Sequence, residues 1–429
     1  MVEITEHMSN HQGMNIHLIP TKKFKTVSIV VKCKAPLDRQ TVTSRALLSY
    51  ILQQGTDKYP SEKELMLKLD ELYGAVFYTD CTKKGNDHII SFRLEIANEK
   101  FIKNETTIIH EALQLLEEII FHPNINEDMF PEKMVRREKS ILKNKIQSIV
   151  DNKIAYANMR LIDEMCENER FSVHTYGYVE DLDKIDAASI YRSYQEMVSN
   201  DQFDLYVVGD FQKEEMENKI TSAFQKVNLQ GKNPTRENEV KTIEKVNEVV
   251  ETQPIQQAKL HIGYRTNCTY RDEDYPALHI FNAIFGGFPS SKLFINVREK
   301  NSLAYYASSR IESHKGLLLV FSGIEGADYK KAREIIDLQM QEMKNGNFTE
   351  EEIKSNKELV ISQIKETLDT AQGMVELFYQ RIIADNQLSP KELIEQIKKV
   401  TKEDVLRVAK KVEPDTVYLL TNEGDESNE

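Results

Sequence analysis

The spacing of hydrophobic residues along the first half of the chain predicts an alternation of strands and helices. Short runs rich in β-branched residues are typical of strands, and apolar residues that recur every three or four positions are typical of helices. The predicted strands are residues 15–19, 26–34, 75–80, 88–96 and 202–209, and the predicted helices are residues 44–54, 61–73, 106–121, 126–150, 151–166 and 186–199. Gly55 ends the dense apolar helix, and Ser61 with Glu64 resembles a capping box at the start of the next one.

The second half repeats this order of elements. Its predicted elements are the strand 258–264, the helices 275–285 and 290–300, the hairpin 303–310 with 317–322, long helices from residue 327, the helix 404–412 and the strand 415–420. With an offset of 228 residues, residues 74–96 superpose on residues 302–324 without a gap. Two copies of one unit are the simplest explanation of this repeat.

These elements predict an α+β fold of the α/β-sandwich type. We expect two tandem homologous halves, in which helices pack on mixed, largely antiparallel sheets. The charged segment 228–250, which contains Gly231 and Pro234, predicts a linker. The expected domains are therefore an N-terminal half at residues 1–227 and a C-terminal half at residues 251–429.

Charge and cysteine content exclude several classes of function. The net charge of −13 is spread along the chain and disfavours nucleic acid and anionic membranes as partners. The four cysteines lie far apart and form no C-x-x-C pair, which favours reduced thiols over a zinc ribbon or a disulfide framework. No apolar stretch of about 18 residues predicts a membrane-spanning helix, and no signal peptide is visible, so we expect a cytoplasmic protein.

Several motifs carry a resemblance to a known family. They are S-R-A-L-L-S-Y-I-L-Q-Q-G-T at 44–56, V-V-G-D at 207–210, Y-P-A-L at 275–278, F-G-G at 285–287, S-S-K-L-F at 290–294, V-R-E-K at 297–300 and L-A-Y at 303–305. This ordered set resembles the zinc metallopeptidases of the pitrilysin, insulinase or mitochondrial processing peptidase family. In that family the first motif carries H-x-x-E-H before a Gly-Thr pair. The resemblance covers nearly the whole chain and implies two clamshell halves.

The zinc ligands that the resemblance implies are missing. Counted from Gly55 and Thr56, the two histidine positions fall on Ala46 and Tyr50, and the position of the general base falls on Ser49. In the segment R-E-K-S-I-L-K-N-K at 137–145, Glu138 matches an earlier glutamate of the family pattern, and the third ligand position falls on Lys145. Alanine has no donor atom, a tyrosine hydroxyl stays protonated, and an ammonium group repels a cation. The resemblance therefore predicts a degenerate site without zinc in this chain.

No other motif replaces this site. The sequence H-E-A-L-Q at 110–114 lacks the last histidine of a zincin helix, and His7 and His11 have no partner carboxylate at a suitable spacing. No nucleophile elbow or phosphate-binding G-K-[ST] motif is present either.

Two residues of the second half match the substrate-binding pair of the family. The resemblance implies that Arg298 and Tyr305 hold the peptide backbone and stabilise charge near the scissile carbonyl. A guanidinium group and a phenol supply hydrogen-bond donors of the kind that this task requires. Asn301 and Ser302 occupy the intervening turn, where a glycine is usual in the family.

These expectations lead to a hypothesis on function. The chain is the non-catalytic, substrate-binding subunit of a heterodimeric zinc metallopeptidase that cleaves peptides, and a sister subunit carries the zinc. The alternative is a structural or peptide-binding scaffold of the same fold without any hydrolysis, which a buried Arg298 would favour. An active homodimeric zinc peptidase requires a metal site that the sequence does not contain.

Overall fold

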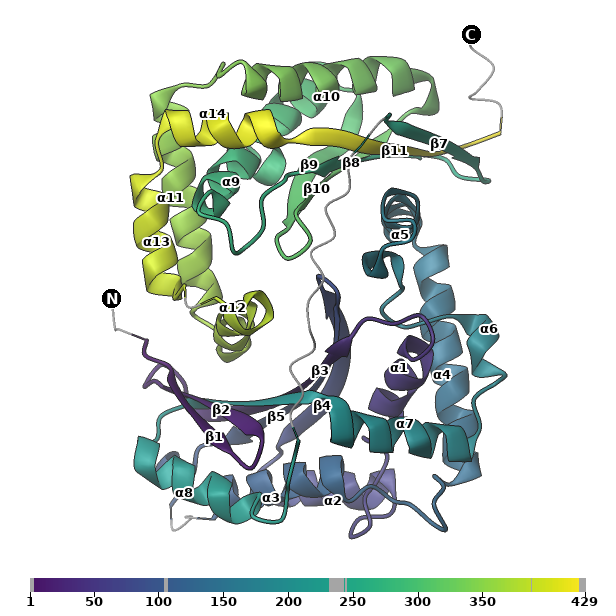
Figure 1. The fold of residues 1–429 in the computed structure, drawn as a ribbon, viewed down its shortest axis with the longest axis vertical. Helices are drawn as coiled ribbons and strands as arrows, with labels where there is room; N and C mark the ends of the chain where they lie inside the picture. The colour runs from purple at the N-terminus through teal and green to yellow at the C-terminus, as the bar shows by residue number, and fades with distance from the viewer. Residues whose placement is uncertain (1–3, 104–106, 231–242, 244, 387, 424–429) are drawn as a thin grey trace. The chain divides into compact units, whose positions relative to one another are not determined.

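The computed structural model describes residues 4–103, 107–230, 243, 245–386 and 388–423. The chain forms two compact units, whose elements are labelled in Figure 1. The first unit comprises Met1–Ser148, Val173–Glu237 and Asp369–Glu376, and the second comprises Ile149–Ser172, Asn238–Leu368 and Leu377–Glu429. Each unit combines helices with one mixed sheet, which confirms the predicted α+β fold.

A six-stranded sheet forms the centre of the first unit. Its strands are β1 (His7–His11), β2 (Met14–Pro20), β3 (Thr26–Pro36), β4 (Val76–Lys84), β5 (Asp87–Ala97) and β6 (Gln202–Gly209). They lie in the order β1-β2-β6-β3-β5-β4. Strands β2 and β6 are parallel, and the other neighbours are antiparallel.

The sheet of the second unit repeats this arrangement. Its strands are β7 (Asn247–Thr252), β8 (Ala258–Arg265), β9 (Ala304–Glu312), β10 (Leu317–Ile324) and β11 (Glu413–Thr421). Their order, β7-β11-β8-β10-β9, corresponds strand by strand to β2-β6-β3-β5-β4, and the parallel pair β7–β11 stands where β2–β6 stands in the first sheet. The expected tandem duplication is therefore visible in the strand order, with β1 as an additional strand of the first unit.

One face of the first sheet packs against helices (Figure 1). These helices are α1 (Val42–Ile51), α2 (Glu62–Glu71), α3 (Ile108–Phe121), α4 (Glu132–Asp151), α6 (Val179–Leu182), α7 (Ala187–Asn200) and α8 (Lys213–Ala223). Val27, Ile29 and Val31 alternate along β3 into this hydrophobic core. The β-branched residues from which the sequence predicted this strand thus line the core.

The opposite face of the first sheet is polar although it is buried. His17 lies between two carboxylates, with Nδ1 2.9 Å from Glu6 Oε1 and Nε2 3.3 Å from Asp204 Oδ1. Its ring stacks on Tyr206 at a centroid distance of 4.2 Å. Burial alone would lower the pKa of His17, but the hydrogen bonds and charges of Asp204 and Glu6 raise this pKa above its ordinary value. The two contacts of the His17 ring therefore connect β2 to β6 and to the segment before β1.

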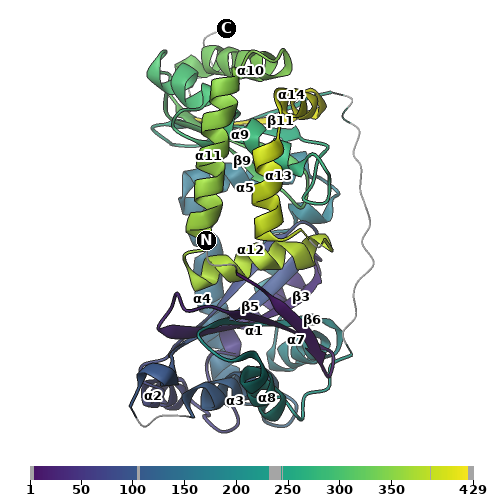
Figure 2. The same ribbon diagram turned by 90° about the vertical axis from the view of Figure 1, so that its left-hand side faces the viewer.

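Helices of the second unit surround the five-stranded sheet. They are α5 (Lys153–Met165), α9 (Tyr275–Asn282), α10 (Tyr329–Lys344), α11 (Glu350–Thr367), most of α12 (Ala371–Ala384), α13 (Pro390–Lys399) and α14 (Lys402–Lys411). Figure 2 shows α11 and α13 side by side. Two π-helices, η3 (Ala283–Gly287) and η4 (Phe294–Glu299), follow α9.

Most predicted elements are present, with shifted ends. The predicted helix 126–150 begins only at Glu132, and strands β1 and β7 were not predicted. Strand β7 begins within the segment predicted as a linker, while residues 231–242 and 244 of that segment lie outside the described residues. The division of the chain at 228–250 stays a prediction. Within the described part of the chain, no helix is long and apolar enough to cross a membrane.

Candidate functional site

Close packing fills the helix α1 positions at which the family resemblance implies zinc ligands. Ala46 and Ser49 are 0% and 1% exposed. Ser49 Oγ donates a hydrogen bond to the carbonyl oxygen of Ala46 at 2.8 Å and accepts one from Cys81 Sγ at 3.3 Å. Thr79 Oγ1 donates to the carbonyl oxygen of Ser49 at 2.8 Å. The polar groups around the general-base position therefore hydrogen-bond to one another, and Ser49 Oγ both donates to and accepts from protein atoms.

The ionisable groups nearby are poor metal ligands. Burial, followed by the charges of Tyr176, Cys81 and Glu138, raises the pKa of Tyr50 to about 12. Burial also raises the pKa of the Cys81 thiol to about 12. Both groups are protonated at neutral pH, whereas zinc binds the deprotonated forms of such ligands.

Helix α4 completes this region with a cation at the implied third ligand position and a buried carboxylate that is paired with Arg137. Lys145 is exposed, and its Nζ lies 5.3 Å from the centroid of the Tyr176 ring in a cation–π contact. Glu138 is buried, and its Oε1 accepts a hydrogen bond from Arg137 Nε at 2.7 Å. Burial raises the pKa of Glu138. Tyr176 thus connects Tyr50 and Lys145, and an ammonium group stands where the third ligand is implied.

These residues do not fit a zinc ion. Of the four implied positions, one has no donor atom, two carry hydroxyl groups, and one is cationic. In the part of the chain that the structure describes, no group of three His, Cys, Asp or Glu side chains could hold a metal ion. No chemistry of a bound metal is therefore assigned to this chain.

Arg298 and Tyr305 lie on neighbouring elements of the second unit and are both accessible. The Arg298 side chain, at the end of η4, is 44% exposed, and Tyr305 on β9 is 64% exposed. The guanidinium of Arg298 lies 4.7 Å from the Phe294 ring centroid, and its Nε lies 3.7 Å from Glu299 Oε1. Tyr305 Oη donates to Glu325 Oε1 at 3.2 Å. In the described part of the chain, the partners of these two groups are therefore the Phe294 ring and single carboxylates at 3.7 and 3.2 Å.

The chain between these residues makes a tight turn. Ser302 has a φ of 53°, in the left-handed region that favours glycine, and its amide donates to the carbonyl oxygen of Arg298 at 3.0 Å. The amide of Leu303 donates to the carbonyl oxygen of Val297 at 3.0 Å. The local backbone explains why a glycine is usual at this turn in the family, and it shows that serine adopts the same turn here.

Glycine is required where η3 packs against β9. A Cβ atom on Gly286 would lie 2.4 Å from Ser309 Oγ and 2.8 Å from the backbone nitrogen of Ser309. The close approach of η3 to β9 therefore depends on Gly286. In addition, π-helical turns such as η3 and η4 are often found at functional sites. The F-G-G motif has a structural explanation at this point.

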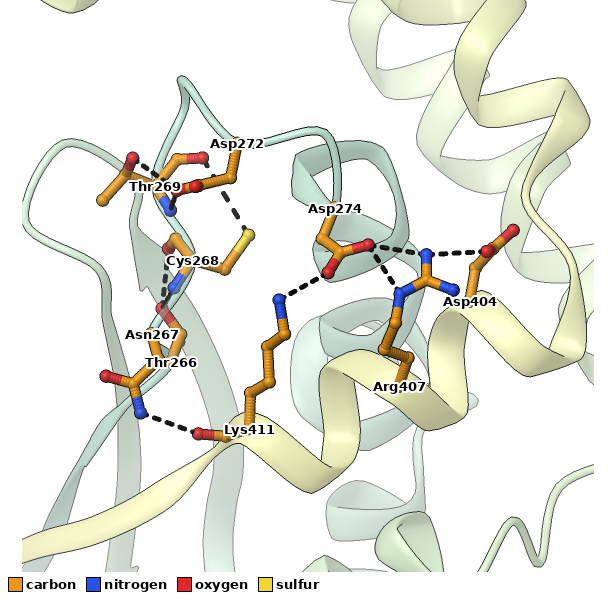
Figure 3. A network of polar contacts seen from close by, with 9 residues as sticks. All are labelled: Thr266, Asn267, Cys268, Thr269, Asp272, Asp274, Asp404, Arg407 and Lys411. Carbon is orange, nitrogen blue, oxygen red and sulfur yellow. Dashed lines mark hydrogen bonds and ion pairs between the residues drawn. The ribbon is translucent and has the colours of Figure 1, made fainter.

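A polar network that the sequence analysis did not foresee holds α9 in place (Figure 3). Asp274, directly before α9, accepts hydrogen bonds from Arg407 Nη2 at 2.6 Å and Lys411 Nζ at 2.7 Å, both from α14. The hydrogen bond from Arg407, with that from Lys411, lowers the pKa of Asp274. Asn267 Nδ2 adds a bond to the carbonyl oxygen of Lys411 at 3.0 Å. Because these partners are more than 130 residues apart, no local pattern could reveal them.

Comparison with known proteins identifies the family. Residues 184–360 match the family model described as "Peptidase M16 inactive domain". The Bacillus subtilis (strain 168) protein named "Probable inactive metalloprotease YmfF" is 45% identical over 420 residues, which cover 98% of each chain. "Uncharacterized zinc protease YmxG" from the same organism is 23% identical over 60% of this chain and 61% of its own length.

Solved structures show the same fold. A conserved protein from Enterococcus faecalis V583 is 33% identical with a TM-score of 0.89, covering 97% of this chain and 99% of its own. A peptidase M16 inactive domain from Pseudomonas fluorescens, 15% identical with a TM-score of 0.79, covers 98% of both chains. The similarity to the Bacillus subtilis protein over nearly the whole chain, together with the family match, establishes that the chain belongs to the M16 peptidase family.

Proposed function

We propose that this chain is the substrate-binding, non-catalytic subunit of a heterodimeric zinc metallopeptidase. In this proposal a sister subunit of the M16 family carries the zinc and hydrolyses the peptide. The 23% identical relative with the printed name "Uncharacterized zinc protease" is of the class expected for such a sister subunit. Short or unfolded peptides are the proposed substrates, and the expected cytoplasmic location stays a prediction.

The observation that carries the proposal is a contrast between two sets of family positions. The implied zinc positions Ala46 and Ser49 are closed by core packing, whereas Arg298 and Tyr305 are exposed and loosely partnered. Loss of the metal site together with retention of an accessible donor pair is expected in a subunit that keeps peptide binding but not hydrolysis. The guanidinium offers several N–H donors and the phenol offers one, which suits peptide carbonyl oxygens.

The position of Tyr305 supports peptide binding in a second way. Among the described residues, β9 pairs with β10 alone and forms an edge of its sheet. A free strand edge can bind an extended peptide through backbone hydrogen bonds. A peptide added at β9 would pass the exposed Tyr305 side chain.

The scaffold hypothesis makes a different prediction about Arg298. A subunit that only supports a complex does not need an exposed guanidinium at this position, and the 44% exposure of the side chain therefore favours substrate binding. The scaffold hypothesis is kept as the alternative that the following experiment distinguishes.

The test combines zinc content with peptide hydrolysis. We expect the purified chain to contain no stoichiometric zinc and to cleave no peptide, and we expect a mixture with a zinc-bearing M16 sister chain to be active. Arg298→Ala should lower kcat/KM of the mixture by about 10- to 1,000-fold, the range for loss of one transition-state donor. Arg136→Ala is the matched control, because Arg136 is an exposed arginine on α4, paired with Glu132 and outside β9.

The outcomes separate the hypotheses. A mixture that hydrolyses no peptide supports the scaffold, and an active mixture that is insensitive to Arg298→Ala contradicts substrate binding by Arg298. Chelator-sensitive cleavage by the chain alone would contradict both hypotheses and the assignment of Ala46, Ser49, Tyr50 and Lys145 as former zinc positions.

A further inference from the structure

A cluster of three cations converges on one carboxylate at the polar face of the six-stranded sheet. Glu376 Oε1 accepts from Lys32 Nζ at 2.6 Å and from Arg93 Nη2 at 2.7 Å, and Lys84 Nζ lies 3.2 Å from Glu376 Oε2. The cations come from three adjacent strands, β3, β5 and β4. Glu376 comes from the segment Asp369–Glu376, which belongs to the first unit although it lies 344 residues from Lys32 in sequence.

The cluster is built into the sheet rather than spread on the surface. The Lys32 side chain is 0% exposed and that of Arg93 is 6% exposed. Lys32 Nζ also lies 3.5 Å from Ser91 Oγ, its neighbour across the ladder between β3 and β5. Burial, in part offset by the attraction of Glu376, lowers the pKa of Lys32 to about 8. Holding a lysine here is costly unless an anion faces it.

Glu376 does not use the full capacity of the cluster. Asp80 Oδ1 lies 3.4 Å from Arg93 Nε and is the second carboxylate of the group, so three cations face two anions. Arg93 Nη1 is buried and has no hydrogen-bond partner in the described part of the chain. Buried guanidinium N–H groups are normally paired, so an unused donor and an excess positive charge indicate room for a further or larger anionic ligand.

Stability alone does not explain the arrangement. Replacement of buried ion pairs by apolar residues of similar volume is often neutral or stabilising. The segment Asp369–Glu376 contributes only eight residues to the first unit, and its other ion pair, Lys23 with Asp369, is largely exposed. Glu376 lies within α12, and its side chain is 27% exposed, so the position of its carboxylate can be reached from solvent.

We propose that Lys32, Lys84 and Arg93 form a binding site for a carboxylate of an acidic peptide, and that Glu376 occupies this site as a built-in competitor. The inference rests on the peptide-binding part of the proposed function but needs neither the sister subunit nor hydrolysis. A glutamate or aspartate side chain of the peptide makes the same charge-assisted hydrogen bonds as Glu376, and a second oxygen can reach Arg93 Nη1. Peptides with acidic residues are thereby selected over neutral ones.

The test measures peptide binding to the full chain by fluorescence anisotropy. Two labelled peptides are compared, one with three glutamates and one with glutamines at the same positions, at constant ionic strength. We expect Glu376→Ala to tighten binding of the glutamate peptide at least tenfold, because the internal competitor is gone. The glutamine peptide should be unaffected. Adding Arg93→Gln to Glu376→Ala should remove the gain.

Asp369→Asn is the matched control, since it breaks an ion pair of the same segment outside the cluster. An equal gain for Asp369→Asn would mean that release of the segment, and not vacancy of the carboxylate site, causes binding, and would overturn the proposal. An equal gain for both peptides would overturn it as well.

A measurement on the unmodified chain covers the case in which Glu376→Ala does not fold. A saturating concentration of the glutamate peptide should increase hydrogen exchange of the amides in Asp369–Glu376, and the glutamine peptide should not. Unchanged exchange with bound glutamate peptide would show that it binds elsewhere and would refute the proposed site. Failure here leaves the heterodimer assay with Arg298→Ala unaffected, so the two proposals fail separately.

Discussion

Ala46→His tests directly whether core packing closes the positions on α1 at which the family resemblance implies zinc ligands. Ala46 has no exposed surface, and the hydroxyl of Ser49 donates a hydrogen bond to the carbonyl oxygen of Ala46. Forcing extra atoms into a well-packed core costs about 1–3 kcal/mol. An imidazole buried without partners costs about 1–3 kcal/mol more. The expected destabilisation is therefore about 2–6 kcal/mol, a large part of the 5–15 kcal/mol that is typical of a folded domain.

Urea unfolding followed by circular dichroism measures this effect as the difference between variant and wild type. Differences are compared because absolute values for a chain of two units combine two transitions. Ser44→His is the matched control, since Ser44 is half-buried on the same helix. We expect its effect to be within about 1 kcal/mol, as for substitutions outside a packed core.

Zinc distinguishes a closed site from an open one. A ligand that binds only the native state stabilises it by RT ln(1 + [L]/Kd), so the free energy of unfolding rises with the logarithm of the ligand concentration. We expect no shift of the unfolding midpoint of Ala46→His with added zinc. A wild-type midpoint for Ala46→His, or a zinc-dependent increase, would refute the conclusion that core packing has closed this position.

Three further predictions concern stability. His17→Gln should lower stability more at pH 6 than at pH 9. The raised folded-state pKa gives His17 a stabilising contribution that is complete below its unfolded pKa of about 6.5 and is lost as pH rises through the folded pKa. Equal losses in urea melts at both pH values would contradict this. Asp201→Asn should cost about 3–5 kcal/mol, because it leaves the buried Arg45 guanidinium, now 2.7 Å from Asp201 Oδ2, without its carboxylate; thermal unfolding measures it, and a loss below 1 kcal/mol would exclude a strong pair. Ser302→Gly should stabilise by up to about 1 kcal/mol by relieving the left-handed backbone, and a marked loss in the same melts would show that the serine side chain has another role.

Local patterns in the sequence determined much of the fold. The run of β-branched residues along β3 located a strand, and Ser61 with Glu64 forms the capping box that the sequence predicted. The same order of elements in both halves predicted the duplication that the two strand orders display. Such features are visible without a structure because they depend on residues a few positions apart.

Strands with weak signals escaped this reasoning. Strand β1 carries the polar sequence H-M-S-N-H, and β7 carries N-E-V-V-E-T, with exposed or half-exposed side chains throughout. Both are edge strands that pair with a single neighbour. Their hydrogen bonds to that neighbour, and not a hydrophobic period, decide their structure.

The sequence by itself determined the family resemblance from motifs at fixed spacing, and it determined the duplication from the order of the elements. It also predicted that the implied zinc positions are degenerate, which stays a prediction. Only the tertiary structure decided that Ser49 bonds to Cys81 in the core and that Arg298 and Tyr305 are exposed. It alone brought Glu376 to Lys32 and Arg93, hundreds of residues away in the chain. Burial and long-range ion pairs arise from packing between distant segments, and no local spacing of residues encodes them.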